Sequence, residues 1–142
     1  MTEMAERRDA LDEEIIKKHI IEKNITNAQR QASGLYYVPK TPGTGDLIQK
    51  GDSVRVHYIG KFLDGYKFES SYDNNQPLRT KVGVVGMIVK GMDEGLQLMR
   101  KDEVATLILP SNLGYGMYGN GGSIPGRTVI QFEVKVLSVK KN

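Results

Sequence analysis

Cysteine is absent from this chain of 142 residues, and histidine occurs only at His19 and His57. Without cysteine the chain cannot build disulfides, thiol nucleophiles or zinc ribbons, and two histidines leave few routes to a catalytic triad. No stretch approaches the roughly 20 consecutive apolar residues that a membrane-spanning helix needs. We therefore expect a single domain without a membrane span, a metal or a cofactor.

An excess of charge of one sign is also missing. The 20 basic against 17 acidic residues give a net charge of +3, and residues 1–45 carry seven of each sign. Nucleic-acid binders show a basic stripe interleaved with aromatics, whereas consecutive basic residues here occur only in pairs, such as the Lys140-Lys141 tail. The sequence therefore predicts no nucleic-acid partner.

The first twelve residues contain four acids and no apolar segment of the kind found in a secretory signal. This composition predicts a cytoplasmic protein if Met1 is the natural start. If a signal has been removed, the periplasm or cell envelope is the expected location.

Glycine and proline divide the chain into two parts, because all 16 glycines and all five prolines lie from Gly34 onward. We expect a helical extension over 1–33 and a main domain over 34–142. Acidic residues precede lysines at helical i,i+4 spacing in the first part, which predicts a helix over about 12–24. Its isoleucines spread over more than one face. The helix could therefore dock on the domain or pair with a second chain, giving a monomer or a dimer.

From Gly34 onward the apolar residues recur at every second position, as in Val54, Val56 and Tyr58. This alternation predicts half-buried strands, joined into an antiparallel sheet. The expected strands are 35–38, 46–49, 53–62, 66–70, 78–82, 103–109 and 128–139.

One segment breaks the alternation. Met92, Leu96 and Met99 recur at helical spacing, with acids in the first turn and Arg100 and Lys101 at the end. This pattern predicts a short helix over 92–99, which can cover one face of the sheet. The expected class is α+β.

Nucleotide binding is suggested by one motif and excluded by its context. Gly114 to Gly119 match G-x-G-x-x-G, but the dinucleotide fingerprint requires a helix to follow, and further glycines and Pro125 prevent one. What remains is a set of aromatic and apolar residues that either line an apolar pocket or simply form the core. These residues are Tyr58, Phe68, Ile88, Val89, Met92, Tyr115, Tyr118 and Phe132.

Eight short motifs follow one another at consistent spacing over roughly residues 46–139. They are Val56-His-Tyr-Ile-Gly60, Leu63-Asp-Gly65, Lys67-Phe-Glu-Ser-Ser71, Gln76-Pro77, Ile88-Val-Lys-Gly-Met-Asp-Glu-Gly-Leu96, Leu113-Gly-Tyr-Gly116, Ile124-Pro125 and Val129-Ile-Gln-Phe-Glu-Val134. In this arrangement the sequence resembles the FKBP family, the macrolide-binding peptidyl-prolyl cis-trans isomerases. The segment 32–45 is similar to the lead-in of bacterial members with a short N-terminal extension.

The resemblance implies a five- or six-stranded antiparallel half-barrel wrapped around the short helix, with a pocket between them. It implies two groups of site residues. Catalytic roles fall to Tyr115, Glu69, Phe68, Tyr58 and Phe132, and substrate contacts to Leu78, Ile88, Val89, Met92, Asn120 and Ile124.

The sequence departs from the family pattern at four of these positions. This chain has Glu69 where the family usually has Asp, Leu78 where it has Phe, and Met92 where it has Trp. Asn120 lies near a position where many members carry His. One extra residue also lies between Gly83 and Gly91. We expect a less aromatic pocket, with a greater effect on macrolide binding than on isomerisation.

The implied activity is isomerisation of X-Pro bonds in peptides and in unfolded client proteins, without a covalent intermediate. The alternative is a non-catalytic peptide-binding module, or a holdase chaperone, on the same fold. In the first case the Tyr115 hydroxyl and the Val89 N–H donate hydrogen bonds to the peptide, and Glu69 lies at the rim of the pocket. A macrolide is a possible further ligand.

Overall fold

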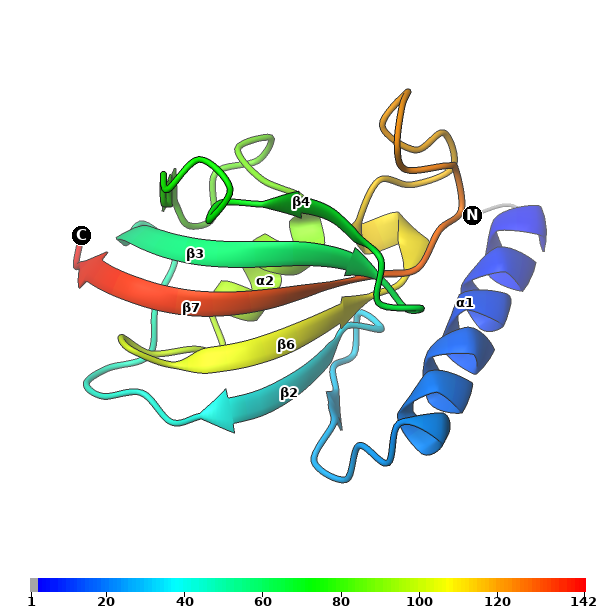
Figure 1. Cartoon of the computed structure of the whole chain (residues 1–142), viewed down its shortest axis with the longest axis horizontal. Helices are drawn as coiled ribbons and strands as arrows, with labels where there is room; N and C mark the ends of the chain where they lie inside the picture. Colours follow the sequence, from blue (N-terminus) through cyan, green and yellow to red (C-terminus); the bar gives the residue numbers. More distant parts are fainter. Residues whose placement is uncertain (1–2) are drawn as a thin grey trace.

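A computed structural model describes residues 3–142, which form two α-helices, one 3-10 helix and a single antiparallel sheet of seven strands (Figure 1). The elements in chain order are α1 Glu3–Glu22, β1 Gln29–Arg30, β2 Tyr36–Thr41, β3 Ser53–Phe62, β4 Lys67–Ser70, β5 Leu78–Lys81, α2 Lys90–Leu96, β6 Val104–Leu109, η1 Ser111–Leu113 and β7 Ile130–Lys140. The predicted α+β class, with a sheet, a short helix and an N-terminal helix, is confirmed.

The sheet is built around its two longest strands, β3 and β7. Their register runs from Ser53 opposite Lys140 to Phe62 opposite Ile130, and the strand order is β1-β2-β6-β7-β3-β4. The other edge of β3 is shared, because β5 pairs with its first half and β4 with its second. The sheet therefore curves around α2, which lies behind β3 and β7 in Figure 1.

Two expectations about strands are wrong. Residues 46–49 form no strand, because the Gln49 N–H donates to Asp52 Oδ2 at 2.9 Å and the chain turns there around the buried Ile48. The number of strands within residues 3–142 is seven rather than five or six, since the two-residue β1 adds to the edge of β2.

The short helix α2 packs closely on β6 because two of its residues lack a side chain. A Cβ atom at Gly91 would lie 2.4 Å from Leu109 Cγ, and one at Gly95 would lie 2.3 Å from Leu107 Cδ1. The helix ends at Leu96 rather than at residue 99, because residues 97–99 form tighter i→i−3 hydrogen bonds. Its buried side chains join the main hydrophobic core.

The N-terminal helix α1 begins earlier than predicted and covers part of the opposite face of the sheet. Its Ile16 is fully buried against Tyr36, Val38 and Ile108, which form a second core. Burial of one such side chain contributes about 1.5–3 kcal/mol. No helix among residues 3–142 has the length and apolarity that crossing a membrane requires. Met1, on which the expected location depends, lies outside the described residues.

An ion pair ties α1 to the start of the sheet. Glu13 Oε1 accepts hydrogen bonds from Arg30 Nε at 2.6 Å and from the Tyr36 hydroxyl at 2.8 Å. Burial alone would raise the pKa of Glu13, but these two hydrogen bonds and the charge of Arg30 outweigh it and lower the pKa. The carboxylate is therefore held in its charged form.

Candidate active site

A cavity of about 420 Å³ opens between the concave face of the sheet and α2. Every layer of the domain contributes to its wall, since the lining comes from β3, β4, β5, β7, α2 and two loops. The lining residues are Tyr58, Glu69, Leu78, Gly86, Met87, Ile88, Val89, Met92, Tyr115 and Phe132.

Most of the residues predicted from the sequence lie in this wall. They are Tyr58, Glu69, Leu78, Ile88, Val89, Met92, Tyr115 and Phe132. The Met92 side chain comes from the first turn of α2 and is 3% exposed, so it is the floor of the cavity rather than its rim. Sequence positions 74 residues apart, at Tyr58 and Phe132, therefore meet in one apolar site.

The aromatic part of the wall has a defined edge-to-face geometry. The Phe132 ring lies 5.9 Å from the Tyr58 ring at 71° and 6.0 Å from the Phe68 ring at 74°. Such pairs stabilise one another beyond the area they bury. Gly60 makes room for them, because a Cβ there would lie 2.7 Å from the Phe68 ring and 2.9 Å from that of Phe132.

The polar groups of the cavity are two phenols near one carboxylate. Burial, together with the charge of Glu69 and a hydrogen bond to it, raises the pKa of Tyr58 to about 12. Burial and the charge of Glu69 also raise the pKa of Tyr115. Both phenols therefore keep their protons at neutral pH and can donate hydrogen bonds.

Three predicted site residues do not line the cavity. Phe68 packs behind Phe132, against Phe62 at 5.1 Å, and supports the wall. Ile124 is 2% exposed and belongs to the main core. The Asn120 side chain turns back on its own loop, where Oδ1 accepts hydrogen bonds from the N–H groups of Gly122 and Ile124 at 2.9 Å each.

Two lining residues, Gly86 and Met87, were missed by the sequence analysis. Both lie in the loop between β5 and α2, where the sequence carries one residue more than the family pattern. That extra residue was the one feature of the sequence that could have indicated a different cavity wall in this loop. Met87 remains 49% exposed, so it is both part of the wall and accessible from solvent.

His57 and Ser71 lie together outside the cavity. The His57 Nδ1 atom is 2.8 Å from Ser71 Oγ, and the His57 ring stacks on Tyr72 at 4.1 Å. Sequence spacing did not predict this pair. The buried Ser71 hydroxyl also binds the backbone of Tyr58, so the pair fastens the end of β4 to β3. Among residues 3–142 no cluster of His, Asp or Glu could hold a metal ion.

The sequence of this domain matches a known family. A family model for the FKBP-type peptidyl-prolyl cis-trans isomerases matches residues 45–137, which include the whole wall of the cavity. The chain belongs to the FKBP family. FKBP proteins of this type are enzymes, the peptidyl-prolyl cis-trans isomerases, and the resemblance seen in the sequence motifs is confirmed.

The relatives of this chain include fungal and bacterial FKBP proteins. The chain is 44% identical over 101 residues to FK506-binding protein 1A of Aspergillus fumigatus, covering 70% of this chain and 89% of that protein. It is 42% identical over 106 residues to an FK506-binding protein of Neisseria meningitidis serogroup B, covering 75% and 96%. A probable FKBP-type isomerase of Haemophilus influenzae is 40% identical over 107 residues, but the match spans only 43% of that protein and 75% of this chain.

A solved FKBP structure is similar over nearly the whole chain. The crystal structure of FkpA from Escherichia coli superposes with a TM-score of 0.77 at 32% sequence identity. The match covers 94% of this chain and 62% of that one. The N-terminal helix is therefore included in the similarity, which extends beyond the matched family region.

Proposed function

We propose that the cavity between the sheet and α2 accelerates rotation about X-Pro bonds in peptides and unfolded proteins, without a covalent intermediate. The observation that carries this proposal is the composition of its wall. Apolar side chains from β5, β7, α2 and one loop surround the two protonated phenols of Tyr58 and Tyr115. Such a site suits a reaction that needs desolvation and hydrogen-bond donors rather than a nucleophile.

The barrier to be lowered comes from amide resonance. A prolyl bond must lose its partial double-bond character to rotate, at a cost of about 18–20 kcal/mol. The twisted amide carries less charge on its oxygen than the planar amide does. An apolar cavity therefore favours the twisted state over the planar one, which is hydrated in solution, and this difference in binding lowers the barrier.

Two donors are placed to hold the peptide during rotation. The Tyr115 hydroxyl lines the cavity and its pKa is raised, so it donates a hydrogen bond to a peptide carbonyl. The Val89 N–H precedes α2 and donates no hydrogen bond within residues 3–142, which leaves it available to a second carbonyl. The Glu69 carboxylate holds the Tyr58 hydroxyl at the rim.

Exposed apolar side chains beside the cavity fit unfolded clients. The loop before α2 exposes Val85 (95%) and Met87 (49%), and the loop that carries Tyr115 exposes Tyr118 (87%). Apolar surface rimmed by polar residues is typical of interaction sites. A macrolide of the FK506 type is expected to compete for the same cavity, with an affinity limited by the aliphatic Leu78 and Met92.

A protease-coupled assay on a proline-containing peptide tests this function. Acceleration of the slow phase supports an isomerase. The competing possibility is a peptide-binding module or holdase, which would perturb the peptide's NMR signals without speeding its exchange. That outcome would overturn the proposed activity.

The exposed side of α1 supports a dimer through this helix. Leu11 and Ile15 lie one turn apart and are 58% and 48% exposed, while Ile16 is buried in the domain. Sedimentation of the full chain and of a Leu11→Glu/Ile15→Glu variant tests this. A dimer that dissociates in the variant supports the proposal, and a monomer in both contradicts it.

A further inference from the structure

A cationic face covers the end of the sheet formed by β5, β3 and β7. Strand register places six outward side chains in two rows, each row crossing the three strands. The first row is Arg79, Arg55 and Ser138, and the second is Lys81, Ser53 and Lys140. Four positive charges and two hydroxyls therefore share this face, and none of the residues that line the hollow on it is acidic.

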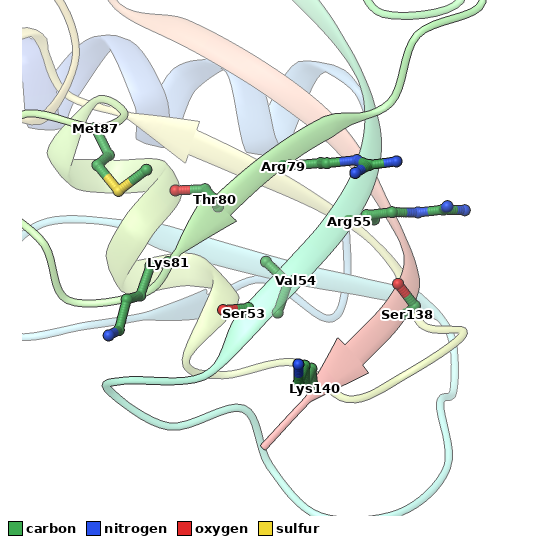
Figure 2. Close-up of a pocket in the computed structure, with 9 residues that line it drawn as sticks. All are labelled: Ser53, Val54, Arg55, Arg79, Thr80, Lys81, Met87, Ser138 and Lys140. Carbon is green, nitrogen blue, oxygen red and sulfur yellow. The ribbon is translucent and has the colours of Figure 1, made fainter. Parts of the chain in front are cut away.

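The pairing of Arg55 with Arg79 is unfavourable in isolation. The two residues are direct register partners on antiparallel strands, and Figure 2 shows their side chains extending in the same direction. Like charges directly opposite one another destabilise a sheet. Within residues 3–142 neither arginine forms an ion pair with an acid, and the nearby Asp52 is engaged by Lys141 at 2.9 Å. An anion bound between them would remove the repulsion.

The surface is also hollowed. A cavity of about 390 Å³ is lined by these six residues together with Val54, Thr80 and Met87. Thr80 is 4% exposed, and among the described residues its hydroxyl is the one buried side-chain polar atom without a hydrogen-bond partner. The hydroxyl points toward Met87 in Figure 2, at the edge of β5 that pairs with no other strand. Thr80 alternates with Arg79 and Lys81 along β5, so its side chain lies on the opposite, buried face of the strand.

The hollow and the candidate active site meet at one residue. Met87 lines both cavities. Arg79 directly follows Leu78, which lines the active-site cavity, so their side chains lie on opposite faces of β5, and a peptide that contacts both passes over the unpaired edge of this strand. Rows of side chains two residues apart on a strand lie about 7 Å apart. Carboxylates at alternate positions of an extended peptide have the same spacing, so such a peptide could contact both rows.

We propose that this cationic face is an extended substrate subsite, which binds an acidic, extended segment of the client polypeptide flanking the prolyl bond. The inference rests on the proposed isomerase function and names its preferred substrate class. The acidic segment supplies the counter-charge that Arg55 and Arg79 lack.

Matched peptides test this subsite. Each contains Ala-Leu-Pro-Phe and an extension of alternating Glu and Gly, or of Gln and Gly as the neutral control. The extension is placed before the core in one pair and after it in another. For one of the two placements, the acidic peptide should show a KM about three- to tenfold lower than its neutral control at low salt, with kcat unchanged. The difference should disappear at 1 M salt.

Variants locate the effect. Arg55→Gln/Arg79→Gln should abolish the preference and leave the rate on the neutral peptides unchanged. The control variant Lys18→Gln/Lys101→Gln removes the same charge from exposed positions outside the hollow. This variant should retain the preference for the acidic peptide. Equal KM values in the wild type, or equal losses in both double variants, would overturn the subsite.

The two proposals fail in distinguishable ways. If no peptide is accelerated, the isomerase function fails, and peptide binding is measured instead by NMR titration. Tighter binding of the acidic peptide that depends on Arg55 and Arg79 would then still support the cationic face. Equal binding of the acidic and neutral peptides would overturn it.

Discussion

Asp12 of α1 accepts two hydrogen bonds from Ser111, which lies 99 residues later in the chain. Its Oδ2 atom is 2.8 Å from the Ser111 backbone nitrogen and 2.6 Å from the Ser111 hydroxyl oxygen, and both residues are buried. Ser111 begins η1, the turn that leads into the loop of Tyr115. The N-terminal helix is thereby connected to the candidate active site.

Replacement of Asp12 should destabilise the fold. Asp12→Asn keeps the size of the side chain but loses a charged acceptor, so we expect the free energy of unfolding to fall by about 1.5–3 kcal/mol. Urea unfolding measures this. Glu14→Gln removes one charge from an exposed position of the same helix and should change the stability little. Equal losses in both variants would contradict the assigned role of the Asp12–Ser111 contact.

Tyr115→Phe should lower kcat/KM about tenfold, because loss of one hydrogen bond to the twisted amide costs about 1.4 kcal/mol. Tyr118→Phe is the matched control, since Tyr118 is 87% exposed in the same loop. Phe68→Ala should also lower activity by loosening the support of Phe132. Unchanged activity in folded Tyr115→Phe and Phe68→Ala would mean that the site is wrongly assigned.

Gly60→Ala should damage the aromatic wall. The new methyl group would meet the rings of Phe68 and Phe132 at less than 3 Å, so we expect a loss of about 1–3 kcal/mol in stability together with reduced activity. Gly122→Ala places a methyl group at an ordinary contact distance, 3.8 Å, from Asn120 Oδ1, and is the control. Thermal unfolding and peptide assays separate the two effects. A Gly60→Ala protein as stable and active as the control would show that the rings do not need this space.

Stability should fall at alkaline pH. Burial and hydrogen bonds to Glu69 and Glu13, respectively, raise the pKa values of Tyr58 and Tyr36 to about 12. In the unfolded chain both phenols titrate near 10. Their contribution is therefore fully present below pH 10 and is lost as the pH rises from 10 to 12, because only the unfolded chain releases its protons there. Chemical unfolding across this range measures the slope. Tyr58→Phe should make stability depend less steeply on pH in this range, and Tyr118→Phe should leave the dependence unchanged. The same slope in the wild type and in Tyr58→Phe would contradict the raised pKa of Tyr58.

The sequence predicted the elements whose burial follows a simple period. Buried residues alternate with more exposed ones over Ser53–Val56 of β3 and Ile130–Val136 of β7, and the predicted ranges of these strands were nearly correct. Residues 46–49 were wrongly assigned as a strand, because one buried residue, Ile48, between exposed neighbours imitates the alternation. The side-chain hydrogen bond of Asp52 that turns the chain there leaves no periodic signal.

The cavity wall was largely predictable because its residues lie within motifs shared by the family. Met87 lies outside those motifs and was missed. Asn120 was included for its position in the loop, although its side chain is used to close that loop. The cationic face was not predictable, since Arg55, Arg79 and Lys140 come together only through strand register.

The central claim is that this cavity catalyses prolyl isomerisation. The most direct measurement is the cis/trans exchange rate of an Ala-Leu-Pro-Phe peptide, with and without the protein, by NMR exchange spectroscopy. We predict faster exchange that a macrolide blocks and that Tyr115→Phe reduces. Peptide signals that shift on addition of the protein while the exchange rate stays at its uncatalysed value would contradict the claim.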